Sequence, residues 1–413
     1  MVRVPDITSE VDLRSGRRLA TILSGRRVLL HFMTGGCVNC LHVLEELRRL
    51  ELPDDLVLVS VHTGKFDREK SDDFVRAFIE RAGIGHPVVN DAEGDLWDRF
   101  AVRAWPTLVL VSPDGYEMAR AGGEGQAARI LGAAAKEAPR SVSDSSFRKV
   151  AAWEGGIFLS RGDRVLACDG EGKILTCYEG FAEPQGIVWA MGRLFVADRL
   201  AGEVVALDTR SGRRERVAAG LRSPWGLASD GRAVQIAEAG AHRIAEWVPG
   251  RGVRTLAGLG HEGVREGDAL GEALFAQPTD LDWLGGALYV ADAEGSALRK
   301  IEEGRVETPV GWDLFTFGDR DGAGEEARLQ HPEGLCAGVG GCGNHRIFVA
   351  DTYNDKIKVF DPLTARTTTL VEGLRMPTGV SKSGCFLYIA DDDAEALARF
   401  DISQLTLERI PIR

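Results

Sequence analysis

The sequence lacks the features that mark several specialised classes of protein. No apolar run approaches the ~20 residues that a membrane-spanning helix needs. The first residues, Met1 to Asp6, contain no apolar core of a secretory signal peptide. Seven cysteines in 413 residues are too few for a disulfide-stabilised scaffold. We therefore expect a cytoplasmic protein without membrane attachment, in which any clustered cysteines are thiols with redox or metal chemistry.

Basic charge and proline are also scarce. Lys and Arg number 50 against 62 Asp and Glu, which gives a net charge of −12, whereas a nucleic-acid-binding protein needs a basic stripe. Glycine is abundant at 50 residues, but it has no Gly-x-y period and only 15 prolines accompany it. This composition excludes nucleic acid as a partner, and also collagen and disordered linker. The glycine excess instead favours β-structure with many turns.

The N-terminal third of the chain alternates strand and helix patterns. Residues 38–51 and 72–81 carry apolar side chains at helical spacing, with charges on the opposite face. Four short apolar runs predict strands, at 28–33, 56–61, 86–90 and 107–111. This alternation indicates an α/β domain with a right-handed parallel crossover. We place the domain at residues 1–140 and a serine-rich linker at 141–146.

An internal repeat begins after this linker. Each copy has a proline, then a glycine in most copies, and then an apolar strand that ends in alanine and an acid. The five copies run from Pro184 to Asp198, Pro224 to Glu238, Pro278 to Asp292, Pro332 to Asp351 and Pro377 to Asp391. Successive prolines are 40 to 54 residues apart, which suits four-stranded propeller blades with loops of variable length. A degenerate sixth copy at 157–178 precedes them, so we predict an all-β six-bladed propeller over residues 147–413.

The recurring acids of this repeat have a structural explanation. An acid at a strand end can accept hydrogen bonds from the backbone amides of its own turn, and glycine tolerates the tight entry to a blade. A catalytic residue is expected to break a repeat and not to define it. We therefore assign a structural role to these five acids: Asp198, Glu238, Asp292, Asp351 and Asp391.

Cys37 and Cys40 form the motif with the clearest chemistry. They follow a buried strand and open a helix, where free backbone N–H groups and the helix dipole stabilise a thiolate at Cys37. Cys40, one turn later, can close a ring and expel a bound partner by thiol–disulfide exchange. Gly35 and Gly36 leave room for a substrate chain. Zinc needs four ligands and a second Cys-x-x-Cys is absent from the sequence, so we expect neither a metal nor another cofactor.

Two further patterns point to a known family. The propeller repeat resembles the NHL repeat, and Trp105-Pro106-Thr107 places a proline before a strand, as the cis-proline of thioredoxin-like proteins does. With Cys37-Val38-Asn39-Cys40-Leu41-His42, the whole chain resembles the NHL repeat-containing protein 2 family. This resemblance implies an α/β thioredoxin-like domain followed by an all-β six-bladed NHL-type propeller. It also implies that Cys37 attacks, that Cys40 resolves, and that Trp105, Pro106 and Gly36 shape a substrate groove.

The sequence departs from the thioredoxin pattern before the cysteines. His31 stands six residues before Cys37, where thioredoxins carry a buried carboxylate that helps to move the proton of the resolving thiol. His31 is either a replacement proton relay or a core histidine bonded to a carbonyl group. In addition, Thr34-Gly35-Gly36-Cys37 resembles the Thr-x-x-Cys of peroxiredoxins, although Leu30 occupies the place of their proline.

These patterns leave more than one function open. The leading hypothesis is a thiol–disulfide oxidoreductase, or a redox-regulated adaptor. Its propeller would bind client proteins, and a thiol reductant would reduce its cysteines again after each reaction. The main alternative is a non-enzymatic scaffold with a vestigial thioredoxin fold. A peroxidase and a propeller hydrolase or lyase are the remaining alternatives. The last would use channel acids such as Asp280 and Glu333, which are otherwise solvated loop acids.

Overall fold

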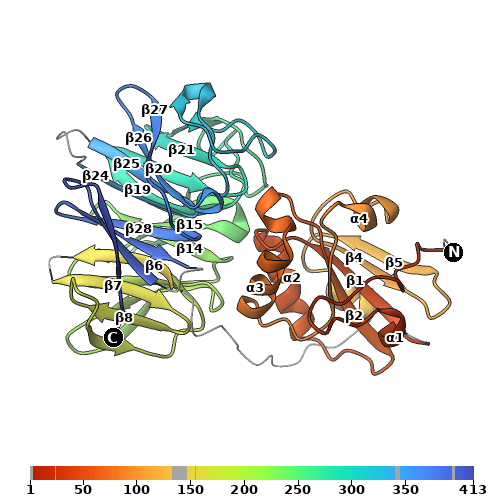
Figure 1. The fold of residues 1–413 in the computed structure, drawn as a ribbon. Coiled ribbons are helices and arrows are strands. Elements are labelled where there is room, and N and C mark those ends of the chain that lie inside the picture. The colour runs from red at the N-terminus through yellow and green to blue at the C-terminus, as the bar shows by residue number, and fades with distance from the viewer. Residues whose placement is uncertain (1–2, 24, 133–146, 154, 340–344, 393–395) are drawn as a thin grey trace. The chain divides into compact units, whose positions relative to one another are not determined.

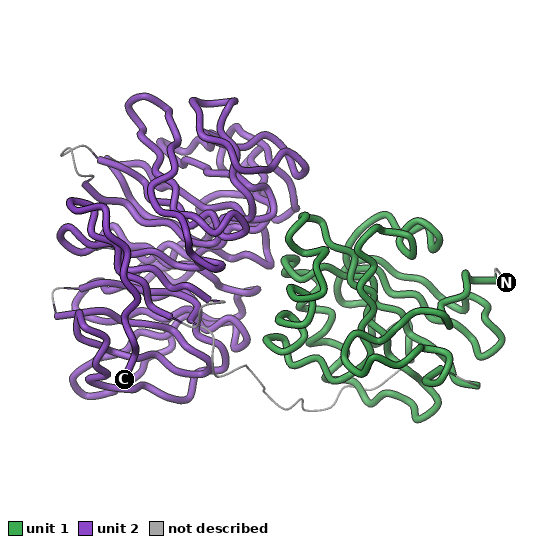
Figure 2. Tube along the Cα trace, viewed as in Figure 1, with its two compact units in different colours: residues 1–143 green, residues 144–413 purple. Residues whose placement is uncertain are grey.

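The computed structural model describes residues 3–23, 25–132, 147–153, 155–339, 345–392 and 396–413. The chain divides into two compact units, residues 1–143 and residues 144–413 (Figure 2). The predicted linker at 141–146 lies outside the described residues. Within the described ranges, no helix is long and apolar enough to cross a membrane.

The first unit is built around one mixed five-stranded sheet of order β3-β2-β1-β4-β5 (Figure 1). The strands are β1 (Arg27–Met33), β2 (Leu56–His62), β3 (Val88–Asn90), β4 (Thr107–Val111) and β5 (Glu117–Gly122). The helices are α1 (Ala20–Leu23), α2 (Val38–Arg48), the short 3-10 helix η1 (Asp67–Lys70), α3 (Asp72–Arg81), α4 (Asp95–Arg99) and α5 (Ala127–Leu131). β1, β2 and β3 are parallel, while β4 is antiparallel to β1 and to β5. The predicted thioredoxin-like α/β fold is confirmed.

Two apolar layers hold helices against this sheet. Alternate residues of β1 point to opposite faces, because the side-chain period of a strand is two. Leu29 packs in a cluster with Val43 and Leu47 of α2. Its neighbour Leu30 packs in the other cluster, with residues of α1 and α4. The sheet is therefore covered on both faces, and the inner side of α2 is fixed against β1.

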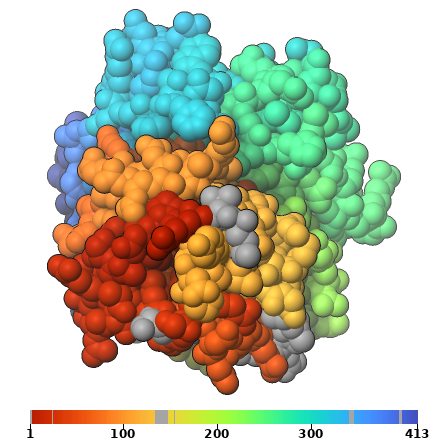
Figure 3. Space-filling model, turned by 90° about the vertical axis from the view of Figure 1, so that its right-hand side faces the viewer, coloured from red at the N-terminus to blue at the C-terminus, as the bar shows by residue number. Residues whose placement is uncertain are grey.

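The N-terminal segment lies beside the hairpin of β4 and β5. The Val4 N–H donates to the Gly115 carbonyl at 2.9 Å, and Arg3 pairs with Tyr116 in an isolated antiparallel bridge. Figure 3 shows this red segment next to the amber residues of the hairpin, on one face of the unit. The contact ties the start of the described chain to the antiparallel edge of the sheet.

The second unit consists of six antiparallel sheets, each formed by consecutive strands (Figure 1). Blade 1 has β6 (Phe147–Trp153), β7 (Gly156–Arg161), β8 (Arg164–Cys168) and β9 (Ile174–Tyr178). Blade 2 has β10 (Pro184–Ala190), β11 (Arg193–Asp198), β12 (Glu203–Leu207) and β13 (Arg214–Ala219). Blade 3 has β14 (Pro224–Ser229), β15 (Val234–Glu238), β16 (Arg243–Val248) and β17 (Gly252–Ala257), with the 3-10 helix η2 (Ala239–Ala241).

The last three blades follow the same plan with two additions. Blade 4 has β19 (Pro278–Leu284), β20 (Ala287–Asp292), β21 (Ala297–Glu302) and β22 (Arg305–Val310), and β18 (Gly267–Asp268) joins its edge. Blade 5 has β24 (Gly334–Val339), β25 (His345–Asp351), β26 (Lys356–Asp361) and β27 (Arg366–Val371), with β23 (Gly322–Ala323) and the 3-10 helices η3 (Gly324–Glu326) and η4 (Thr352–Asn354). Blade 6 has β28 (Pro377–Ser383), β29 (Phe386–Asp391), β30 (Ala396–Asp401) and β31 (Thr406–Ile410). The six-bladed propeller is confirmed, and the degenerate first copy forms a complete blade.

The inner strands pack in a ring, and β28 of the last blade contacts β6 of the first. Glycine is required here by close backbone contact between blades. A Cβ atom on Gly186 would lie 2.3 Å from the Trp225 carbonyl oxygen, and one on Gly379 would lie 2.9 Å from the Lys149 Cα atom. The ring is fastened at its seam by the C-terminus, since the Ile174 N–H donates to the Arg413 carbonyl at 2.7 Å.

The acids of the repeat join successive segments of the same blade. The Asp198 carboxylate accepts from the backbone N–H of Ala182 and Glu183, at 2.7 and 2.8 Å. Asp391 accepts in the same way from the Arg375 N–H at 2.6 Å. The predicted structural role is confirmed, but the main donors lie in the segment that enters the blade and not in the turn that follows the acid. The acid at the end of the second strand therefore hydrogen-bonds to the segment that leads into the first strand of the same blade.

Candidate functional site

The cysteine pair is placed by the junction of β1 and α2. Cys37 is the N-cap of α2 with extended backbone angles, φ −82° and ψ 114°. Its carbonyl accepts from the Leu41 N–H at 3.2 Å and from the Cys40 N–H at 3.1 Å, and the Cys40 N–H is shared with the Cys37 Sγ atom at 3.4 Å. The predicted position at the start of a helix is thus confirmed. A backbone N–H directed at sulfur favours the thiolate form, as does the positive end of the helix dipole.

Both residues of this pair are thiols, and both are largely covered. Cys37 is 9% exposed and Cys40 is fully buried on the inner side of α2. Cys37 is therefore the more solvent-exposed cysteine of the two, and Cys40 is the more deeply buried one. This order of exposure matches the order of attack and resolution in thiol–disulfide exchange.

Trp105 and Pro106 lie at the same end of the sheet as the cysteines. Thr107 of β4 is opposite Phe32 of β1, and the two strands are antiparallel. Trp105 and Pro106 therefore precede β4 where β1 leads into the cysteine loop. The peptide bond between them is cis, the isomer that the thioredoxin resemblance implies, and the Trp105 ring packs on Trp97 with centroids 4.5 Å apart. Pro106 is buried and Trp105 is half-buried.

A buried acid that the sequence analysis missed holds the loop before Cys37. Glu69, in η1, is fully buried. Its Oε2 atom accepts from the Thr34 hydroxyl at 2.6 Å, and its Oε1 atom accepts from the Gly36 N–H at 2.9 Å. No spacing rule links Glu69 to Cys37, because the two residues come from different elements. The only signal in the sequence was a polar Thr34 directly after a buried strand.

His62 at the end of β2 anchors the same loop from a second side. Its Nε2 atom accepts from the Gly35 N–H at 3.0 Å, and its ring packs beside Phe74 and Phe78, with ring centroids 6.2 and 6.1 Å away. Burial lowers the pKa of His62 to about 4, so the ring is neutral at pH 7. Gly35 itself is packed against these phenylalanines, since a Cβ atom there would lie 3.0 Å from Phe74. Gly35 therefore serves this packing, which corrects the expectation that it leaves room for substrate.

His31 is buried without a hydrogen-bond partner on either ring nitrogen. The expectation of a core histidine bonded to a carbonyl group is therefore wrong. Burial, with a smaller contribution from His86, lowers the pKa of His31 to about 3. The alternation of β1 puts His31 on the same face as Leu29, the face that α2 covers. His31 is thus a neutral imidazole whose ring nitrogens have no hydrogen-bond partner, on the sheet face that α2 and Cys40 cover.

The channel acids are not solvated loop acids. Asp280 is 9% exposed and forms an ion pair with Lys149, with 3.1 Å between Oδ2 and Nζ. Glu333 lies 3.5 Å from the His331 ring nitrogen, and its side chain is 14% exposed. Both acids therefore have cationic partners inside the propeller. Among the described residues no group of three or more His, Cys, Asp or Glu is arranged to hold a metal ion.

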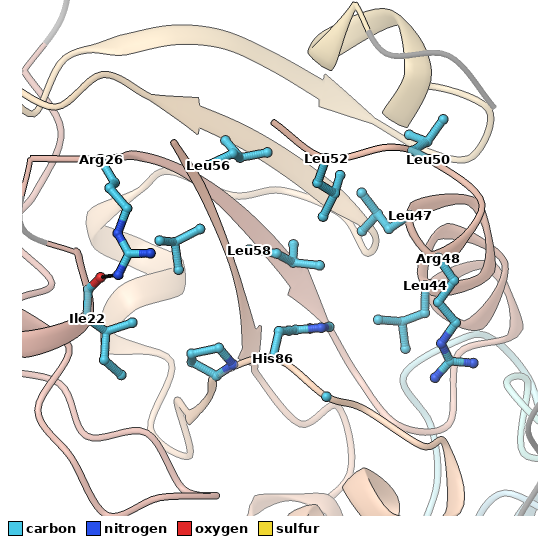
Figure 4. A pocket seen from close by; sticks show the side chains of 13 residues that line it. Ile22, Arg26, Leu44, Leu47, Arg48, Leu50, Leu52, Leu56, Leu58 and His86 are labelled. Atoms are coloured by element: carbon cyan, nitrogen blue, oxygen red, sulfur yellow. Dashed lines mark hydrogen bonds between the residues drawn. The ribbon is translucent and has the colours of Figure 1, made fainter. Parts of the chain in front are cut away.

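A separate cavity of about 590 Å³ lies in the first unit. Figure 4 shows leucines of α2 and β2 between two arginines, Arg26 and Arg48, which stand on opposite sides. Leu56, which lines it, begins β2, whereas Cys37 follows the end of the parallel strand β1. The cavity is therefore at the other end of the sheet and does not belong to the cysteine site.

Comparison with known proteins agrees with this geometry. Residues 25–117 match the model of a thioredoxin-like family. The sequence is 29% identical to NHL repeat-containing protein 2 of Bos taurus over 94% of this chain and 68% of that protein. The chain is a homologue of NHL repeat-containing protein 2. The shared region takes in both the thioredoxin-like unit and the propeller.

Two further similarities widen the comparison beyond NHL repeat-containing protein 2. The chain is 30% identical to Protein SUPPRESSOR OF QUENCHING 1, chloroplastic, of Arabidopsis thaliana, over 98% of this chain but only 48% of that protein. An auxiliary nutrient binding protein from Bacteroides thetaiotaomicron has a similar fold, with a TM-score of 0.50 and 11% identity. The matched region covers 74% of this chain and 83% of that chain. At this identity the likeness concerns the fold alone.

Proposed function

We propose that the protein is a thiol–disulfide oxidoreductase, or a redox-regulated adaptor, that acts on client proteins. The observation that carries the proposal is the Cys37 Sγ atom at the N-cap of α2, with the Cys40 N–H directed at it at 3.4 Å. This arrangement stabilises negative charge on the more exposed sulfur and keeps a second thiol one helical turn away. Trp105, Pro106 and Gly36 line the approach to Cys37 in this proposal.

The reaction has two exchange steps. The Cys37 thiolate attacks one sulfur of a client disulfide, which forms a mixed disulfide and releases the other client sulfur as a thiolate. The Cys40 thiolate then attacks the Cys37 Sγ atom, which releases the reduced client and leaves a Cys37–Cys40 disulfide. Two electrons have passed from the pair to the client. The released client thiolate takes up the Cys40 proton, with the neutral His31 ring as its relay in this scheme, and an external dithiol reductant restores the two thiols.

The propeller supplies the client-binding surface in this proposal. Its loop between β22 and β23 exposes two aromatic side chains, Trp312 at 44% and Phe315 at 72%. Exposed aromatic residues are enriched in the central part of protein interfaces. In this proposal the protein works as a thiol in a reducing compartment such as the cytoplasm.

Mixed-disulfide trapping tests the exchange reaction. The Cys40→Ser variant removes the resolving thiol, so clients from a cell lysate should stay bound to Cys37 and be released by dithiothreitol. The Cys37→Ser/Cys40→Ser variant is the matched control, and Cys385→Ser controls for an exposed thiol elsewhere in the chain. Equal amounts of dithiothreitol-sensitive adducts in all three variants would contradict the proposal.

The second candidate is a scaffold without redox turnover. It is favoured by the burial of Cys37 at 9% exposure and by the missing carboxylate at position 31. A scaffold would bind the same clients in native, Cys37→Ser and Cys40→Ser forms, and Phe315→Ser would weaken that binding in each form. Client capture that depends on Cys37 separates the oxidoreductase from the scaffold.

A further inference from the structure

Glu69 makes more contacts with the cysteine loop than a surface acid would. Besides the Thr34 hydroxyl and the Gly36 N–H, its carboxylate accepts from the Lys65 N–H at 2.8 Å and from the Phe66 N–H at 3.2 Å. All four partners bring a hydrogen atom to the carboxylate. A protonated carboxyl group would need an acceptor for its own hydrogen, and the three backbone N–H partners cannot accept one. The arrangement therefore favours the ionised form.

The chain is also shaped to admit this carboxylate. Gly64 begins the segment that carries Glu69, and a Cβ atom on Gly64 would lie 2.8 Å from the Glu69 Cβ atom and 3.1 Å from the Lys70 backbone nitrogen. The segment therefore closes around Glu69 only with glycine at this position.

Glu69 brings a carboxylate to the loop of residues 34–36. Glu69 and His62 are titratable side chains bonded to this loop, and His62 is neutral at pH 7. His31, on the neighbouring strand, is also neutral. The Glu69 carboxylate therefore contacts the residue directly before Cys37, close to the positive end of α2. The two fields oppose each other at the Cys37 sulfur.

We propose that Glu69 is a positioning and charge-setting residue that restrains the reactivity of Cys37: its buried carboxylate holds the Thr34–Gly36 loop and disfavours the Cys37 thiolate. The proposal rests on the proposed thiol chemistry of Cys37. It also bears on the peroxidase alternative. The single hydroxyl proton of Thr34 is donated to Glu69, so Thr34 does not offer it to a peroxide at Cys37.

The test is the pH profile of Cys37 alkylation by iodoacetamide in the full chain, followed by mass spectrometry of the Cys37 peptide. Glu69→Gln keeps the shape and removes the charge. Its profile should have a midpoint about one pH unit lower than that of the native chain, with a several-fold faster reaction at pH 7. Asp73→Asn removes an exposed acid of nearby α3 and should leave the midpoint within about 0.3 unit.

A second variant separates charge from loop geometry and does not depend on how well Glu69→Gln folds. Glu69→Asp keeps the negative charge but is one methylene too short to make all four hydrogen bonds. It should keep the native midpoint within about 0.5 unit, whereas a purely structural role predicts a change as large as that of Glu69→Gln. An unchanged midpoint in Glu69→Gln, or equal shifts in both variants, would overturn the proposal. Alkylation needs no turnover, so it tests Glu69 even if no client is trapped.

Discussion

Lys149 and Asp280 meet at the centre of the propeller, with the Nζ and Oδ2 atoms 3.1 Å apart. They occupy the position that is glycine in the other four blades, and they belong to blades 1 and 4, which are opposite each other in a ring of six. Both side chains are nearly buried, at 4% and 12% exposure. The pair therefore links two opposite blades across the centre of the ring.

Breaking this pair is expected to destabilise the propeller strongly. Asp280→Ala leaves the Lys149 charge buried without its partner, which costs about 3–5 kcal/mol of unfolding free energy. Lys149→Met/Asp280→Leu removes both charges and should lose much less. Urea unfolding followed by tryptophan fluorescence measures these differences. Glu215→Ala removes the exposed partner of Arg193 and should cost less than about 1 kcal/mol. A double variant as unstable as Asp280→Ala would contradict the argument.

Close contact between blades predicts a large effect for a single methyl group. In Gly379→Ala the new Cβ atom would lie 2.9 Å from the Lys149 Cα atom and 3.2 Å from the Arg148 carbonyl oxygen. Backbone must move to admit it, at a cost of about 1–3 kcal/mol. Gly85→Ala is the control, because nothing lies within 4 Å of its Cβ position. If thermal melting shifts equally in the two variants, blade contact is not the reason for the glycine.

Two buried histidines and the half-buried His86 predict that the thioredoxin-like unit is sensitive to acid. Burial lowers the pKa to about 3 for His31, about 4 for His62 and about 4 for His86. In the unfolded chain each would bind a proton near pH 6.5. Stability is therefore complete above about pH 6.5 and falls as the pH drops towards 4, because the unfolded state takes up more protons. Hydrogen exchange of β1 amides at pH 7 and pH 5, corrected for intrinsic rates, measures this loss.

His331 in the propeller predicts the opposite response. Burial opposes its charge, yet Glu294 and Glu333 raise its pKa to about 9. The contribution of His331 to stability is therefore present below about pH 6.5 and lost as the pH rises through 9. Hydrogen exchange of β24 and β25 amides at pH 7 and pH 9.5 reports it, and His331→Gln should remove the difference. A pH response that persists in His331→Gln would assign it to another group.

Sequence patterns predicted the parts of this protein that repeat or that depend on neighbours in the chain. The proline-to-acid spacing gave the blades, and Cys37 was placed at a helix start because local spacing is enough to define that position. Glu69 and His62 were missed because they reach the cysteine loop through the fold of other elements. Lys149 was missed because its blade lacks the proline and acid that mark the repeat, so its alignment with the blade glycines appears only in three dimensions.

The closed ring of blades has a consequence for cooperativity. In a linear repeat array the end repeats have a free face, so unfolding can begin there and spread along the array. Here the first and last blades contact each other, and the strand at Ile174 bonds to Arg413. Each blade therefore packs against one neighbour on each side. Unfolding of any one blade would expose the faces of two others. The six repeats should melt as one unit, and a weak point in any blade lowers the stability of all of them.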